Sequence, residues 1–198
     1  MNKEQSKKDF YTKLAKQENF PARSIYKLQE IDKKFGLFRA GDSVLDLGCS
    51  PGSWLVYIAR KVGDSGKVCG IDIEEPKIEL GPNMSFVEKD VLAPDILSLP
   101  ILSQKYSAVV SDLAPHTTGL KFQDSQNSFL LCQRALEIAA AVLVKGGSFA
   151  CKMFESEKTA VFVRQLRRYF KTVKIIKPQA VKKGSREVYL AAKNFIGN

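Results

Sequence analysis

Ser43 to Trp54 reads SVLDLGCSPGSW and predicts a strand, a tight loop and the start of a helix. Residues 43–47 form a short apolar run that is interrupted by one acid, Asp46. Residues 54–62 carry apolar side chains at helical spacing. In an open parallel sheet, ligands bind beyond the carboxyl ends of the strands. The loop between these two segments is therefore the expected position of a cofactor.

The loop is composed of residues that suit a close approach to a ligand. Gly48 and Gly52 lack a Cβ, so the backbone can pass near a ligand and adopt turn conformations that other residues resist. Pro51 stiffens the loop, and Ser53 is expected to be the N-cap of the following helix. A glycine turn without a ligand is the alternative interpretation of this pattern.

The glycine spacing narrows the choice of cofactor. A dinucleotide site uses G-x-G-x-x-G, and the third glycine is missing here, while no Gly-Lys-Ser/Thr follows as in a P-loop. An acid before the loop, Asp46, suits a ligand with a cationic end and no phosphates, and S-adenosylmethionine is such a ligand. Asp72 closes the next expected strand, residues 67–73, where a carboxylate commonly binds ribose hydroxyls. The pattern therefore favours S-adenosylmethionine over a nicotinamide cofactor.

Composition indicates one globular domain. The chain has 198 residues, of which 44% are hydrophobic and 26% are charged. The longest apolar run, residues 135–144, is too short to span a bilayer, and the N-terminus does not resemble a signal peptide. The four cysteines form no C-x-x-C pair and there is a single histidine, so we expect no metal site. A cytoplasmic, reducing environment and no membrane partner are expected.

Charge is spread unevenly along the chain. Residues 1–39 have a net charge of +5, residues 40–150 of −4 and residues 151–198 of +9, counted from Lys, Arg, Asp and Glu. Basic ends around a mildly acidic centre suggest a polyanionic partner, with nucleic acid first and a membrane surface second. Solvated surface lysines are the alternative explanation.

Strands and helices are expected to alternate. The expected strands are residues 43–47, 67–73, 83–88, 106–112, 148–154, 172–177 and 187–193, and the expected helices are residues 9–17, 24–35, 54–62, 124–144 and 158–170. Such alternation predicts a parallel sheet with helices on both faces. The last two strands are joined only by a loop, so they should be antiparallel. We expect one α/β domain, residues 1–198, in which a basic helical extension, residues 1–39, packs on a catalytic core, residues 40–198.

Four charged residues occupy unusual positions, namely Lys27, Asp112, Lys152 and Glu187. Lys152 lies inside an apolar strand pattern, where a lysine is costly to bury unless its charge is paired or its pKa is lowered. Asp112 ends a strand, and a loop containing proline and glycine follows it. The plainer interpretations are a helix-surface lysine for Lys27, a strand-end cap for Asp112 and a salt bridge to a neighbouring cation for Glu187.

Five motifs together resemble the FtsJ/RrmJ family of RNA ribose 2′-O-methyltransferases. They are RSIYKL, DLGCSPGSW, SDLAP, SFACKMF and SREVY, and they follow the family's order over nearly the whole chain. The resemblance implies a Rossmann-like, seven-stranded methyltransferase fold with one antiparallel strand near the C-terminus. It also implies a catalytic Lys-Asp-Lys-Glu tetrad at Lys27, Asp112, Lys152 and Glu187.

The same resemblance implies an S-adenosylmethionine site, which would be formed by Asp46, Gly48, Pro51, Gly52, Trp54, Asp72, Asp90 and Asp112. Trp54 could equally be a core residue. The chain has Ser53 where family members often have a second glycine, and His116 where they often have asparagine. A change at position 116 can alter contacts with the target nucleotide.

Transfer of a methyl group to a ribose hydroxyl needs a base, because the hydroxyl is a poor nucleophile until its proton begins to leave. We hypothesise that Lys152 is this base. Burial and a nearby cation lower the pKa of a lysine, and Lys27 would be that neighbouring cation. Asp112 and Glu187 would orient the two ammonium groups.

RNA would be bound mainly through its phosphates by the basic ends. The candidate residues are Lys7, Lys8, Arg23, Lys182, Lys183 and Arg186. The short chain favours large-subunit ribosomal RNA, or the large ribosomal subunit, as substrate, and the family resemblance implies uridine as the target nucleotide. A tRNA anticodon loop is the alternative substrate, and a non-catalytic RNA-binding module is the alternative class. We expect a monomer.

Overall fold

The computed structural model describes residues 3–182 and 184–197, with side chains from residue 10 onward. Seven strands form one sheet in the order β3-β2-β1-β4-β5-β7-β6. Their bounds are β1 Ser43–Leu47, β2 Lys67–Asp72, β3 Met84–Glu88, β4 Tyr106–Ser111, β5 Leu143–Phe154, β6 Phe170–Ile176 and β7 Glu187–Phe195. The strands from β3 to β5 pair in parallel, whereas β7 is antiparallel to both β5 and β6. The prediction of a mostly parallel sheet with one reversed strand is confirmed.

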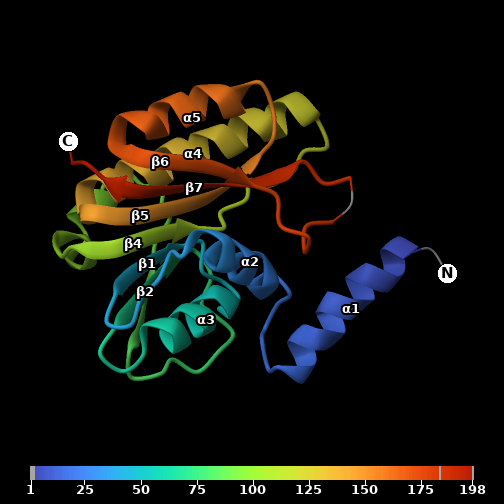
Figure 1. Cartoon of the computed structure of the whole chain (residues 1–198), viewed down its shortest axis with the longest axis horizontal. Coiled ribbons are helices and arrows are strands. Elements are labelled where there is room, and N and C mark those ends of the chain that lie inside the picture. The colour runs from blue at the N-terminus through green and yellow to red at the C-terminus, as the bar shows by residue number, and fades with distance from the viewer. Residues whose placement is uncertain (1–2, 183, 198) are drawn as a thin grey trace.

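Helices cover both faces of the sheet, as expected (Figure 1). One face is covered by α4 and α5, and the other by α2 and α3. The helices are α1 Lys3–Gln17, α2 Ile25–Phe35, α3 Ser53–Val62, α4 Lys121–Val142 and α5 Lys158–Tyr169, and two short 3₁₀ helices, Ile96–Ser98 and Pro100–Ser103, lie between β3 and β4. None of the helices within the described ranges is long and apolar enough to cross a membrane.

The burial of β1 explains why the central strands of the sheet consist mainly of apolar residues. Val44, Leu45 and Leu47 are completely buried, because layers of helices cover both faces of the sheet. Asp46 is also completely buried and is the one charged residue of this strand. Cys49, Cys69, Cys132 and Cys151 are buried free thiols.

The N-terminal segment contacts the core mainly through α2. The apolar stripe of α2, which includes Ile25, Leu28 and Ile31, is completely buried. In α1, Ala15 is buried and the ring of Tyr11 lies 5.2 Å from that of Tyr26. Figure 1 shows the remainder of α1 extending away from the sheet.

Several local predictions were wrong. The helix α1 begins at Lys3 rather than residue 9, and the strand β6 begins at Phe170 rather than residue 172. Ser53 does not cap α3, since the N-cap is Gly52 with no side-chain cap bond. The Ser53 hydroxyl instead accepts the N–H of Ala22 and donates to its carbonyl. The strand β5 begins at Leu143 rather than residue 148, because Leu143 pairs with Tyr106 ahead of a register shift. The helix α4 begins at Lys121 rather than residue 124.

Candidate active site

A cavity of about 700 Å³ opens at the carboxyl ends of the parallel strands. Its walls come from the segments that follow β1, β2, β3 and β4, together with one side of α4. Five of the residues predicted to bind the cofactor line it, namely Gly48, Pro51, Asp72, Asp90 and Asp112. The other three, Asp46, Gly52 and Trp54, lie outside the lining. This is the edge of the sheet at which α/β proteins bind their ligands.

The loop after β1 is shaped by two glycines with left-handed backbone. Gly48 has φ of +78°, and a Cβ at this position would lie 2.8 Å from the Leu113 side chain. Gly52 has φ of +108°, and a Cβ there would lie 2.9 Å from Ile78. A larger residue would therefore strain the backbone and push into the loops on either side of the cavity.

Asp72 links this loop to the end of β2. One carboxylate oxygen accepts the N–H of Ser50 at 2.8 Å, and the other accepts the N–H of Glu74 at 3.1 Å. The two loops on this side of the cavity are therefore fixed by the same side chain. Asp90, after β3, accepts the N–H of Leu92 in the same way.

Asp46 differs from these acids. It is completely buried, and neither carboxylate oxygen has a hydrogen-bond partner among the described residues. Burial raises the pKa of Asp46 well above its usual range, and the nearby carboxylates of Asp112 and Asp72 raise it further. A buried carboxylate without a partner is costly, and a cation bound in the adjoining cavity would offset part of that cost.

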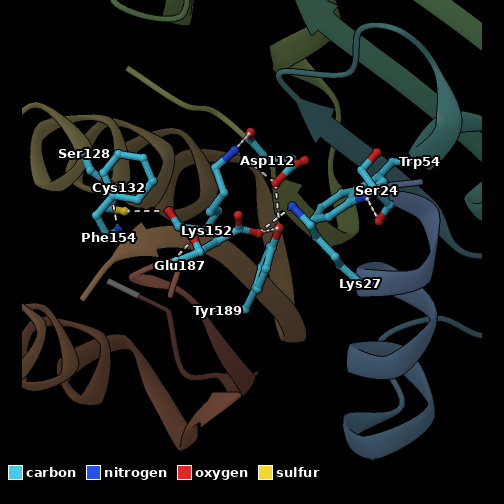
Figure 2. Close-up of polar contacts among 11 residues, drawn as sticks. Ser24, Lys27, Trp54, Asp112, Ser128, Cys132, Lys152, Phe154, Glu187 and Tyr189 are labelled. Atoms are coloured by element: carbon cyan, nitrogen blue, oxygen red, sulfur yellow. Dashed lines mark hydrogen bonds and ion pairs between the residues drawn. The ribbon is translucent and has the colours of Figure 1, made fainter. Parts of the chain in front are cut away.

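The four residues of the predicted tetrad come together at one point (Figure 2). Lys152 projects from β5, its Nζ lies 3.2 Å from Oδ1 of Asp112, and it donates a hydrogen bond to the main-chain carbonyl of Asp112. Lys27 projects from α2, and its Nζ lies 2.6 Å from Oε1 of Glu187, the first residue of β7. The two lysines approach the two acids from opposite sides. All four side chains are largely shielded from solvent.

Tyr189 joins the two ion pairs, and the sequence analysis missed it. Its hydroxyl oxygen lies 2.7 Å from Oδ1 of Asp112 and 2.8 Å from Oε1 of Glu187. Burial raises the pKa of Tyr189, and the two carboxylates raise it further, so the phenol keeps the proton that it donates. The signal was present, since positions 187 and 189 lie on the same face of a strand.

The chain matches the model of the FtsJ-like methyltransferases over residues 20–195. It belongs to this family.

Relatives and a solved structure agree with the assignment to the FtsJ-like methyltransferases. The chain is 43% identical over 183 residues to Ribosomal RNA large subunit methyltransferase E of Desulfatibacillum aliphaticivorans, covering 92% of this chain and 88% of the relative. It is 43% identical over 182 residues to the protein of the same name from Desulforapulum autotrophicum, covering 92% and 90%. A crystal structure described as a ribosomal RNA methyltransferase from Plasmodium falciparum superposes with a TM-score of 0.80 at 28% identity, covering 90% of this chain and 100% of that one.

In this FtsJ-like chain, Trp54 packs behind the tetrad. It is buried, its indole N–H donates to the carbonyl of Ser24 at 3.1 Å, and its ring lies 6.0 Å from that of Tyr189. The structure therefore places Trp54 in the core between the loop of residues 48–52 and α2, and its bond to Ser24 fixes the start of the helix that carries Lys27.

The candidate RNA-binding residues differ in their burial and in their contacts. Arg23 is half-buried before α2, and Lys182 is exposed between β6 and β7. Arg186 donates to the carbonyl of Lys121 and to Oγ of Ser125, and its guanidinium lies over the ring of Phe154. The side chains of Lys7 and Lys8, and the whole of Lys183, lie outside the described residues.

Proposed function

We propose that this chain transfers the methyl group of S-adenosylmethionine to the 2′-hydroxyl of a ribose in large-subunit ribosomal RNA. The observation that carries the proposal is the Lys152–Asp112 pair, because Asp112 also lines the cavity of about 700 Å³ and so brings a proton acceptor next to a site for the methyl donor. The names of the curated relatives favour the large ribosomal subunit as the source of the substrate.

The acids around the cavity fit a cationic cofactor. Asp72 would bind the ribose hydroxyls, Asp90 would line the same cavity, and Asp112 would face the ammonium and sulfonium charges, with the buried carboxylate of Asp46 nearby. The unpartnered carboxylate of Asp46 supports this assignment, since a bound cation gives it a partner of opposite charge. When bound, the cofactor supplies an electrophilic methyl group.

In the proposed reaction, Lys152 in its neutral form accepts the proton of the ribose hydroxyl as the oxygen attacks the methyl carbon. The new C–O bond replaces the C–S bond, and the sulfonium leaves as a neutral thioether. Asp112 holds the Lys152 side chain through both its carboxylate and its carbonyl. Lys27, held by Glu187, places a positive charge near the oxygen as negative charge develops on it.

The basic ends of the chain would hold the RNA through its phosphates, and the described tetrad is built by one chain without a partner's residues. We propose that the enzyme acts as a monomer and works in the cytoplasm, where its substrate would be found. Phosphate contacts release counterions, so the affinity for RNA should fall steeply as salt is raised. An affinity that stays constant from low to moderate salt would contradict this mode of binding.

The decisive experiment offers tritium-labelled S-adenosylmethionine with three unmodified substrates in parallel: large ribosomal subunits, naked ribosomal RNA and tRNA. We expect label in the large subunit or its RNA, resistant to alkali because a 2′-O-methyl group blocks cleavage of the adjoining phosphodiester. Label in tRNA alone would redirect the proposal to the anticodon loop. No label, with cofactor binding intact, would favour a non-catalytic RNA-binding module.

A further inference from the structure

Two side chains at the start of α4 are exposed to an unusual degree for their type. Leu120 is 69% exposed and Phe122 is 71% exposed, the highest values among the large hydrophobic residues that the structure describes. Lys121 lies between them and is exposed as well. Single exposed apolar residues need no explanation. An aliphatic, a cationic and an aromatic side chain in succession suggest a binding surface, which we call the α4 corner, residues 120–122.

The α4 corner is held by two chain segments that adjoin the acids of the tetrad. On one side, the segment that begins at Asp112 leads into it, and Asp124 fixes the end of this segment by accepting the N–H and the hydroxyl of Thr118 at 2.7 and 2.9 Å. On the other side, Arg186 adjoins Glu187 and donates to the Lys121 carbonyl at 3.2 Å. The exposed ring is therefore carried on a turn held by segments that lead to Asp112 and Glu187.

The chemistry of the α4 corner matches a nucleotide. An unpaired base presents two apolar faces, and aromatic side chains stack on them without regard to sequence. The phosphates on either side of such a base are anionic, and Lys121 and Arg186 supply cations at the same place. The C-terminal residues 151–198, with a net charge of +9, extend this attraction to a polyanion. An apolar protein partner would offer no anion to the exposed Lys121.

We propose that Phe122, supported by Leu120, stacks on an unpaired base beside the target nucleotide of the RNA. A ribose that reaches Lys152 must leave its stack, and the neighbouring base then loses one of its own stacking partners. The Phe122 ring replaces that partner and holds the RNA open at the site. This inference rests on the proposed function and adds a specificity contact to it.

The test compares Phe122→Ala, Phe122→Trp and a control, Leu97→Ala, in the full chain. Leu97 is also an exposed apolar residue, at 42%, but it lies in a short 3₁₀ helix next to a separate groove lined by residues of α4 and α5. The probe is the RNA that accepts methyl groups in the assay above. We expect Phe122→Ala to raise the Kd for this RNA at least about fivefold, since stacking one base contributes on the order of 1–3 kcal/mol. Leu97→Ala should leave the Kd for RNA unchanged, and none of the variants should change the affinity for the cofactor.

Two further readouts separate stacking from a general loss of charge or fold. The effect of Phe122→Ala should be the same at low and moderate salt, because a stacking contact releases no counterions. The fluorescence of Phe122→Trp should be quenched when RNA binds, against the background of the buried Trp54. If the wild type methylates RNA while Phe122→Ala binds it equally well, or if the new tryptophan is not quenched, the inference is wrong and the proposed function stands. If the wild type methylates no RNA, the proposed function itself fails.

Discussion

Asp46 lies near the end of β1 and Asp112 directly follows the neighbouring strand β4, but the two carboxylates differ in their polar partners. Asp46 pairs in register with Val110 of β4, and the N–H of Asp112 donates to Leu47 of β1. Asp112 has two partners, Lys152 and Tyr189, whereas the Asp46 carboxylate has none among the described residues. The groups proposed to act on the ribose are therefore already assembled in the free protein. The proposed cofactor side includes a completely buried carboxylate that has no partner among the described residues, and we propose that the cationic cofactor neutralises it.

This difference assigns separate tasks to the two sides of the site. Charged groups that are already oriented need no reorganisation when the reaction starts, which is how preorganised sites lower a barrier. A buried acid without a partner instead favours the binding of a cation. Variants on the Asp112 side should change the rate of methyl transfer, and variants at Asp46 should change cofactor affinity.

The largest effect is expected for Lys152→Ala. The variant removes the proposed base and leaves the Asp112 carboxylate with Tyr189 alone. Loss of a general base costs about 10²–10⁴-fold in rate, and Lys152→Arg should be similarly inactive because a guanidinium does not accept a proton at neutral pH. Single-turnover methyl transfer measures the rate, and calorimetry with S-adenosylmethionine should show near-normal binding. A variant that keeps more than about a tenth of the wild-type rate would exclude this role.

Asp46→Asn should change the affinity for the cofactor rather than the rate of methyl transfer. The amide removes the negative charge that would meet the cationic end of the cofactor, so the Kd for S-adenosylmethionine should rise about tenfold, the order expected for a lost charged hydrogen bond. The rate at saturating cofactor should change much less. Calorimetry and a saturation series separate the two quantities. Unchanged cofactor affinity would show that Asp46 does not face the ligand's charge.

The stability of the free protein should depend on pH through the same residue. The pKa of Asp46 is raised by folding, so between its unfolded value near 4 and its folded value the native state binds more protons than the unfolded state. This contribution to the free energy of unfolding is complete below about pH 4. The contribution is lost as pH rises through the pKa that Asp46 has in the folded protein. Asp46→Asn removes it, so urea unfolding at several pH values should give a flatter curve for the variant. Parallel curves would contradict an unpartnered carboxylate.

Tyr189→Phe tests how far the two ion pairs act together. The variant keeps the buried ring and removes only the hydroxyl that lies between Asp112 and Glu187. One hydrogen bond is worth on the order of 1 kcal/mol, so kcat should fall about three- to tenfold, with little change in cofactor affinity. The double variant with Glu187→Gln shows whether the effects are additive. Full additivity would mean that Tyr189 does not link the two pairs.

The residues that local patterns identified are those with an unexpected charge or a required backbone conformation. Lys152 within SFACKMF and the glycines of residues 48–52 were recognisable because both are costly without a purpose. Tyr189 was not recognised, because a tyrosine in a strand is also an ordinary core residue. The hydrogen-bond partners of Ser53 and Trp54 lie about thirty residues away in the sequence. Hydrophobic periodicity does not predict contacts over that separation. The roles of these three residues depend on tertiary contacts rather than on the local sequence.

Ser53→Ala should have the smallest effect. The Ser53 hydroxyl joins the first turn of α3 to Ala22, in the segment that leads to Lys27, and the Trp54 indole makes a second bond to the carbonyl of Ser24. Losing the hydroxyl should lower the free energy of unfolding by about 1 kcal/mol, with kcat within about twofold, since the indole bond keeps α2 in position. Ser24→Ala is the matched control, because its carbonyl, which the indole uses, remains. If Ser53→Ala reduced kcat as much as Tyr189→Phe, the loop of residues 48–52 and Lys27 would have to move as one unit, and the division between the two sides of the site would no longer hold.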